Sequence, residues 1–159
     1  MCSSDLEHAA VSHIDLYTTV LDAVGVAQSA STASSHSRSL LQPLDPDRVV
    51  LSEYHTVGSK AAVFMIQDAR TKYIHYVDHP PQLFDLANDP EEVHDLASST
   101  GARDRLVQWE ASLRQWCDPD DVDRRAKQRQ RELVEHYRSE EHTSELQSLA
   151  YLVCRLLLE

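Results

Sequence analysis

Three strand-like runs between residues 48 and 77 constrain the fold most strongly. The runs 48–55, 61–67 and 72–77 are rich in β-branched and aromatic residues, and short turn-like breaks separate them. Such short breaks favour antiparallel pairing of neighbouring strands. Pro80 and Pro81 are expected to end the third run, because proline cannot donate to a strand ladder, and residues 82–86 to add a short edge strand. The prediction is a three- to four-stranded antiparallel sheet.

Helical patterns flank these strands on both sides. Residues 11–24 place their apolar side chains largely on one helical face, and Gly25 follows as a stop. Residues 103–116 carry an apolar stripe that would cover one face of the sheet, and the stripe consists of Leu106, Trp109, Leu113 and Trp116. The residues Asp89, Pro90, Glu91 and Glu92 read as a helix start, and a mostly polar helix is expected over 120–137 after Asp118 and Pro119. The fold class is therefore α/β, in an α+β arrangement.

Composition excludes several partner classes. The 159 residues include 26 Asp and Glu against 15 Lys and Arg, a net charge of −11. Such a balance argues against binding to nucleic acid or to an anionic membrane, because phosphates need clustered cations. A helix needs a run of about 18 apolar residues to span a bilayer, and the sequence contains no such run. The three cysteines cannot build a disulfide framework, and their spacing does not suggest zinc.

Both ends of the sequence look foreign to the rest. Residues 138–148 and 152–159 match the codon-by-codon translation of a sequencing adapter, and residues 1–6 match the opposite adapter strand. We therefore expect residues 1–6 and 138–159 to be adapter-derived, and they are left out of the fold prediction. The native N-terminus would then be missing, which leaves the compartment open between bacterial cytoplasm and periplasm.

Five segments, in order along the chain, resemble blocks of the sulfatases. They are VSHIDLYTTVLDAVGV at 11–26, SLL at 39–41, SEYH at 52–55, FMIQDARTKYI at 64–74 and QLFDLANDPEE at 82–92. Residues 117–130, CDPDDVDRRAKQRQ, resemble the C-terminal helix of choline-sulfatase-like members. Five positions depart from the family pattern: Thr18, Ser37, Gln67, Ala69 and Thr71 stand where Pro, Gly, Arg, Gly and Tyr are usual.

The resemblance implies a C-terminal fragment of a sulfatase of the alkaline phosphatase superfamily. In that family a large α/β domain precedes a small subdomain with a four-stranded antiparallel sheet and a packed helix. Residues 7–47 would be the end of the large domain and residues 48–137 the C-terminal subdomain. The helix at 11–24 would then be separated from its parent sheet, and its apolar face would be exposed.

The resemblance also implies a chemistry that needs parts not found in this sequence. Sulfatases use a formylglycine made from the Cys or Ser of a C/S-x-P-x-R motif, seated on calcium. Cys117 is not followed by that motif, because Asp121 stands where Arg is needed. We therefore nominate no catalytic residue and no metal ligand, and we expect the chain alone to be inactive. Calcium and formylglycine are expected of the parent protein only.

Four residues are candidates for substrate binding. Glu53, Tyr54 and His55 lie at a strand end that borders the substrate pocket in the family, and a carboxylate beside an aromatic ring suits a quaternary ammonium such as choline. Lys72 could contact an anion. A polar strand end and a lysine lying along a sheet face are the structural alternatives for these residues.

Three functions stay open. The first is hydrolysis of small-molecule sulfate esters, either choline sulfate or an aryl or carbohydrate sulfate. The second is hydrolysis of phosphonate esters or phosphodiesters by a member of the same superfamily. The third is a non-catalytic acidic binding or assembly module. The helix over 119–137 could also join copies of the chain into a homo-oligomer.

Overall fold

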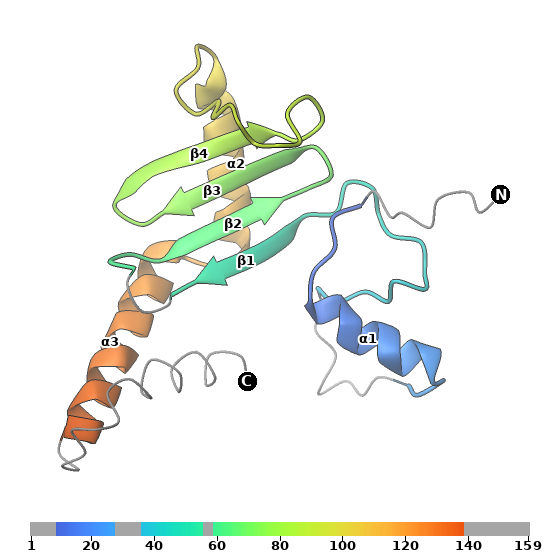
Figure 1. Ribbon diagram of the computed structural model, residues 1–159, viewed down its shortest axis with the longest axis horizontal. Coiled ribbons are helices and arrows are strands. Elements are labelled where there is room, and N and C mark those ends of the chain that lie inside the picture. The colour runs from blue at the N-terminus through green and yellow to red at the C-terminus, as the bar shows by residue number, and fades with distance from the viewer. Residues whose placement is uncertain (1–8, 28–35, 56–58, 139–159) are drawn as a thin grey trace.

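The computed structural model describes residues 9–27, 36–55 and 59–138 and has the predicted α+β architecture (Figure 1). The adapter-like ends therefore lie outside the described residues, apart from Arg138. The elements in chain order are α1 (Ile14–Ala23), β1 (Val50–Tyr54), β2 (Val63–Gln67), β3 (Thr71–Tyr76), β4 (His79–Asp85), α2 (Ala102–Trp116) and α3 (Pro119–Arg138). Within this part of the chain, no helix is both long and apolar enough to cross a membrane.

The four strands form one antiparallel sheet in the order β1-β2-β3-β4. Glu53 pairs with Phe64 and Phe64 with His75, so these three side chains form a row on one face. The neighbouring row on this face includes Ile66 and Tyr73. This face carries the core, since the side chains of Phe64, Ile66, Tyr73 and Leu83 are fully buried.

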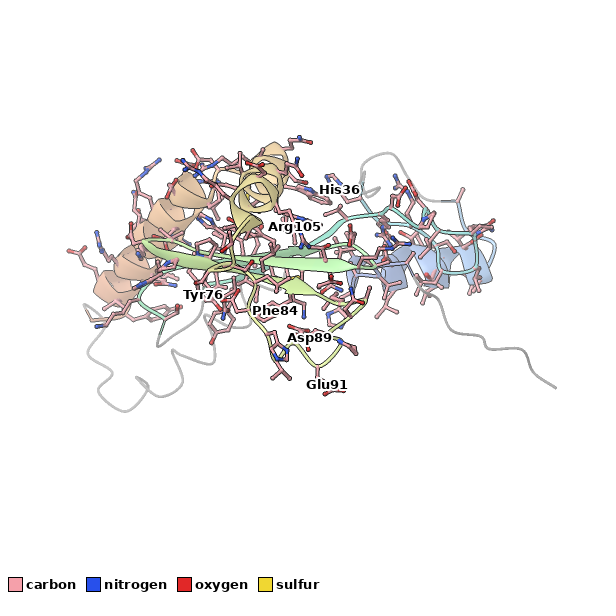
Figure 2. All side chains as sticks on the ribbon, turned by 90° about the horizontal axis from the view of Figure 1, so that it is seen from above. His36, Tyr76, Phe84, Asp89, Glu91 and Arg105 are labelled. Atoms are coloured by element: carbon pink, nitrogen blue, oxygen red, sulfur yellow. The ribbon has the colours of Figure 1, made fainter. Side chains whose placement is uncertain are left out.

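Helix α2 covers the core face of the sheet, as predicted. Leu113 is fully buried in the core cluster, and Leu106 and Trp109 pack against that cluster. Figure 2 shows α2 and α3 on one side of the sheet, whereas Phe84, Asp89 and Glu91 lie on the other. Trp116, the fourth residue of the predicted stripe, instead contacts His36, with 4.1 Å between the ring centroids. The last turn of α2 therefore packs on the loop before β1.

Pro80 and Pro81 lie inside β4, so the prediction that they end the third strand and precede the next one was wrong. They are tolerated because β4 is the edge strand of the sheet. The pairing of β3 with β4 shifts by one residue between Ile74 and Tyr76, opposite the two prolines. The irregular pairing and the missing N–H groups therefore coincide.

The predicted helix start at residues 89–92 was also wrong, because this segment forms turns. The carboxylate of Asp89 accepts hydrogen bonds from the backbone N–H groups of Val93 at 3.1 Å and His94 at 2.8 Å. Glu92 adopts a positive φ of 54°, which an α-helix does not allow. The capping residue thus closes a loop instead of opening a helix.

Helix α3 is anchored to the β1–β2 end of the sheet by two side chains. Asp123 accepts a hydrogen bond from the buried N–H of Ala62 at 2.8 Å, and Gln130 donates to the carbonyl of His55 at 2.7 Å. Val122 packs against the core cluster. The C-terminal half of α3 extends past the sheet (Figure 1).

Helix α1 is tied to the loop that precedes β1. Ser37 donates to the carbonyl of Ile14 at 2.9 Å and its hydroxyl contacts that of Thr18, so two positions that depart from the sulfatase pattern meet. Arg48 and Asp15 form an ion pair. The apolar face of α1 is largely uncovered, as expected, with Ile14, Leu16, Tyr17, Val20 and Val24 between 46 and 64% exposed.

Candidate functional site

A groove of about 490 Å³ lies between the start of α1 and the side of the sheet away from α2, and we call it the β1 groove. Val50 pairs with Gln67 and Ser52 with Met65, so these four side chains share one face of β1 and β2. The lining residues are Val11, Ser12, His13, Leu16, Leu40, Val50, Leu51, Ser52, Glu53, Met65 and Gln67. The groove thus combines an apolar surface with a few polar groups, which is typical of small-molecule sites.

Glu53 and His55 form the one close pair among the four predicted residues. His55 Nε2 lies 3.0 Å from Glu53 Oε2, and the side chains are 12% and 39% exposed. The His55 ring packs edge-on against Phe64 with 5.4 Å between centroids. His55 Nδ1 is buried and has no hydrogen-bond partner within the described part of the chain. Residues i and i+2 of a strand share a face, which explains why these two side chains meet.

Tyr54 lies on the other face of the sheet. It pairs with Val63, which in turn pairs with Tyr76, and its side chain is 51% exposed. Successive residues of a strand point to opposite faces. Glu53 and Tyr54 therefore do not face one common ligand position from the same side of the sheet.

Lys72 is apart from the other three residues. Its ammonium forms an ion pair with Glu92. Lys72 pairs in register with Gln67, which lines the β1 groove, so it lies on the groove side of the sheet, one strand further along. The structure therefore brings Glu53 and His55 together but leaves Tyr54 and Lys72 in other surroundings. The substrate-binding role of all four stays a prediction.

The described side chains do not fit a calcium site. No group of three or more His, Cys, Asp or Glu residues in the described ranges could hold a metal ion. The thiol of Cys117 is half-buried, and its pKa is raised by burial and by the nearby carboxylates of Glu53 and Asp118. A raised pKa keeps the thiol protonated and weakly nucleophilic. Burial also lowers the pKa of His75, which favours the neutral imidazole.

Of the eleven residues that line the groove, only Glu53 was a predicted site residue, and His13, Met65 and Gln67 are among the ten that were not. His13 immediately precedes α1, whereas Met65 and Gln67 belong to β2. The alternation of β2 predicts that Met65 and Gln67 share a face, because Phe64 and Ile66 are the core residues. The local sequence does not predict that α1 packs near that face of the sheet.

No family profile matches the chain, but individual proteins do. The chain is 38% identical over 98 residues to arylsulfatase K of Danio rerio and 32% identical over 103 residues to arylsulfatase K of Homo sapiens. Each match covers 55% of this chain and 18% of the relative. The chain thus spans about a fifth of the length of the curated relatives that it matches.

Solved structures show the same likeness in three dimensions. A Bacteroides thetaiotaomicron protein assigned to the sulfatases is 28% identical, with a TM-score of 0.53 over 71% of this chain and 24% of that one. A 2-O GAG sulfatase is also 28% identical, with a TM-score of 0.52 and the same coverage. The chain is therefore similar in sequence to arylsulfatases over 55% of its length and similar in fold to sulfatase structures over 71% of its length.

Proposed function

We propose that the chain is the C-terminal part of a sulfatase that hydrolyses sulfate esters. This proposal rests on the agreement between two comparisons, since the chain is similar to arylsulfatases in sequence and to sulfatases in fold. The curated relatives with identities above 30% are arylsulfatases, so the phosphonate and phosphodiester alternative is not favoured.

The described residues would contribute a wall of the substrate pocket. Glu53 belongs to the strand that lines the β1 groove, but its carboxylate lies on the opposite face of the sheet, where it is 39% exposed and 3.0 Å from His55 Nε2. A carboxylate held in this way can accept hydrogen bonds from hydroxyl or amino groups of a substrate. The sulfuryl transfer itself would depend on groups that this sequence does not contain. We therefore propose that the chain alone is inactive and that calcium and formylglycine belong to the rest of the parent protein.

The substrate class that the geometry supports better is an aryl or carbohydrate sulfate. Choline recognition by Glu53 and Tyr54 together would need both side chains on one side of the ammonium group. The two residues lie on opposite faces of the sheet, so they do not form such a cage by themselves. Arylsulfatase and GAG sulfatase are also the activities named for the relatives.

The test compares this chain with the product of its parent gene. Both are assayed on 4-nitrophenyl sulfate, choline sulfate and a phenyl phosphonate ester. We expect turnover of a sulfate ester by the parent product and none by the 159-residue chain. Turnover by the purified chain would overturn the proposed inactivity, and a parent that cleaves only the phosphonate would overturn the sulfatase assignment.

A variant of the parent tests the role of Glu53. Glu53→Gln keeps the shape of the side chain but removes its charge, and we expect KM to rise by roughly tenfold if a charge-assisted hydrogen bond to substrate is lost. Asp121→Asn on the exposed side of α3 is the matched control and should leave KM unchanged. Equal KM values for both variants would remove Glu53 from the substrate pocket.

A further inference from the structure

The hydrogen-bonding pattern of the sheet determines which backbone groups of β1 point away from it. In the β2–β3 hairpin, the N–H of Asp68 donates to the carbonyl of Thr71 at 3.1 Å. Hydrogen-bonded and non-hydrogen-bonded pairs alternate along an antiparallel ladder, so the even-numbered residues of β2 bond to β3 and the odd-numbered ones bond to β1. The β1 partners of these odd-numbered residues are Val50, Ser52 and Tyr54. The N–H and C=O groups of Leu51 and Glu53 therefore point outward.

These outward groups lie at an open edge of the sheet, because β1 is the first strand in the sheet order. Among the described residues, neither the N–H nor the C=O group of Leu51 or Glu53 takes part in a hydrogen bond. His55 is the next outward residue, and its carbonyl accepts a hydrogen bond from Gln130 at 2.7 Å. Figure 1 shows α3 near this end of β1. The edge before His55 can therefore accept a further strand.

The β1 groove reaches this open edge. Residues 50–53 all line the groove, although their side chains alternate between the two faces of the sheet. Consecutive residues of a strand can line one groove when the groove includes the edge of the strand as well as one face. An added strand would place every second side chain beside Val50 and Ser52, next to the apolar groove residues Leu16 and Leu40.

Glu53 provides a charge on the other face of the same edge. Its carboxylate is 39% exposed, and its partner is His55 Nε2 at 3.0 Å. A carboxylate can accept several hydrogen bonds, so it can bind a cation and His55 together. A residue paired with Glu53 on an added strand would present its side chain on the same face, where opposite charges attract each other.

We propose that the β1 edge binds an extended, antiparallel segment of a partner protein in which basic and apolar residues alternate. The basic residue pairs with Glu53, and the apolar residues one and three positions after it point into the β1 groove. A second copy of the chain is a poorer occupant, because two chains of net charge −11 would place both Glu53 carboxylates on one face of the joined sheet. This inference does not depend on the proposed sulfatase function.

The probe is a short synthetic peptide with blocked ends, Thr-Thr-Lys-Val-Thr-Val-Thr. The full chain is labelled with ¹⁵N, and the exchange of its amide protons with water is followed by NMR. At saturating peptide we expect exchange at Leu51 and Glu53 to slow by roughly tenfold or more, because their N–H groups gain acceptors. Exchange at Ser52 should change less, since its N–H already faces β2. Slowing at alternate residues distinguishes an added strand from general stabilisation.

A change of charge in the peptide tests the role of Glu53 without altering the chain. A peptide with Glu in place of Lys should bind at least about tenfold more weakly to the original chain. Glu53→Gln should lose most of this preference for the Lys peptide. Glu91→Gln is the matched control, because it removes the same charge from the other side of the sheet (Figure 2), and it should keep the preference.

Three results would overturn the proposal. The first is equal affinity of the original chain for the Lys and Glu peptides. The second is slowing at Ser52 as strong as that at Leu51 and Glu53, because the peptide would then stabilise the fold from another site. The third is protection of Leu51 and Glu53 that grows with chain concentration in the absence of peptide, which would assign the edge to a second copy.

Discussion

Arg48 and Asp15 form an ion pair with two hydrogen bonds, Nη1 to Oδ2 at 2.8 Å and Nη2 to Oδ1 at 2.7 Å. The Asp15 side chain is fully buried and that of Arg48 is 11% exposed. The same carboxylate accepts the backbone N–H groups of Ser12 at 2.7 Å and Arg38 at 2.9 Å. One side chain therefore joins the start of α1, the following loop and the residue that leads into β1.

Replacing Asp15 with Asn should destabilise the chain strongly. The variant would leave the buried guanidinium of Arg48 without its counter-charge, and such losses cost about 3–5 kcal/mol. Asp22→Asn on the same helix is the control, because its exposed carboxylate binds Ser39 and Gln42, and it should lose less than about 1 kcal/mol. The measurement is urea unfolding followed by circular dichroism. Equal losses for the two variants would contradict a central role for Asp15.

The effect of Asp15 should depend on pH. Burial by itself raises the pKa of Asp15, but hydrogen bonds from Arg48 and from the N–H groups of Ser12 and Arg38 outweigh it, so the pKa lies below its ordinary value of 3.8. A folded-state pKa below the unfolded one stabilises the fold above pH 3.8, and this contribution disappears as pH falls through the folded-state value. The difference in free energy of unfolding between the original chain and Asp15→Asn should therefore be constant near neutral pH and shrink below pH 3.8. A difference that persists in strong acid would show that charge is not its cause.

Asp123→Ala should loosen α3 from the sheet. Asp123 accepts the buried N–H of Ala62 and pairs with Lys127 at 2.7 Å. Without the carboxylate, the buried N–H of Ala62 has no hydrogen-bond acceptor, and the free energy of unfolding should fall by about 1–3 kcal/mol. Asp121→Ala removes a carboxylate that pairs with Arg125 on the exposed side of α3, and it should change stability by no more than about 0.5 kcal/mol. Thermal unfolding of both variants checks this, and a larger loss for Asp121→Ala would contradict it.

The uncovered face of α1 should cause self-association. Leu16 and Val20 lie one helical turn apart and are 54% and 61% exposed, next to other exposed apolar side chains. Leu16→Ser combined with Val20→Ser should lower the fraction of associated chains in sedimentation velocity experiments at high protein concentration. Val107→Ser on α2 removes an equally exposed apolar side chain from another surface, and it should not lower the fraction of associated chains. If the Val107 variant reduces association as much, the contact does not involve α1.

The sheet and helices could be predicted because their signals are local. The strand runs and the α2 stripe each repeat within a few residues, and burial of Phe64, Ile66 and Leu113 follows the expected periods. The errors at residues 80–81 and 89–92 have a different origin. Strand β4 tolerates its prolines because it lies at the sheet edge. Asp89 accepts hydrogen bonds from the N–H groups of Val93 and His94 instead of capping a helix. Both features depend on tertiary structure, which the local sequence does not indicate.

The candidate site was predictable only in part. The spacing of Glu53 and His55 on one strand is enough to place them side by side, and it also puts Tyr54 on the other face. Lys72 was grouped with them by residue type, but its partner Glu92 comes from a loop 20 residues away. The β1 groove requires α1 to approach β2, and such long-range contacts leave no periodic signal in the sequence.

The edge of the sheet at β4 is closed to further strands. Pro80 and Pro81 lack N–H groups, and Leu83 uses its own N–H and carbonyl to bind Asp95 at 3.0 Å and Leu96 at 2.8 Å. A second chain that adds a strand in amyloid-like fashion would find no regular ladder there. Misassembly through strand addition would have to begin at β1, the opposite edge, so a solubilising mutation of the sheet belongs on that strand.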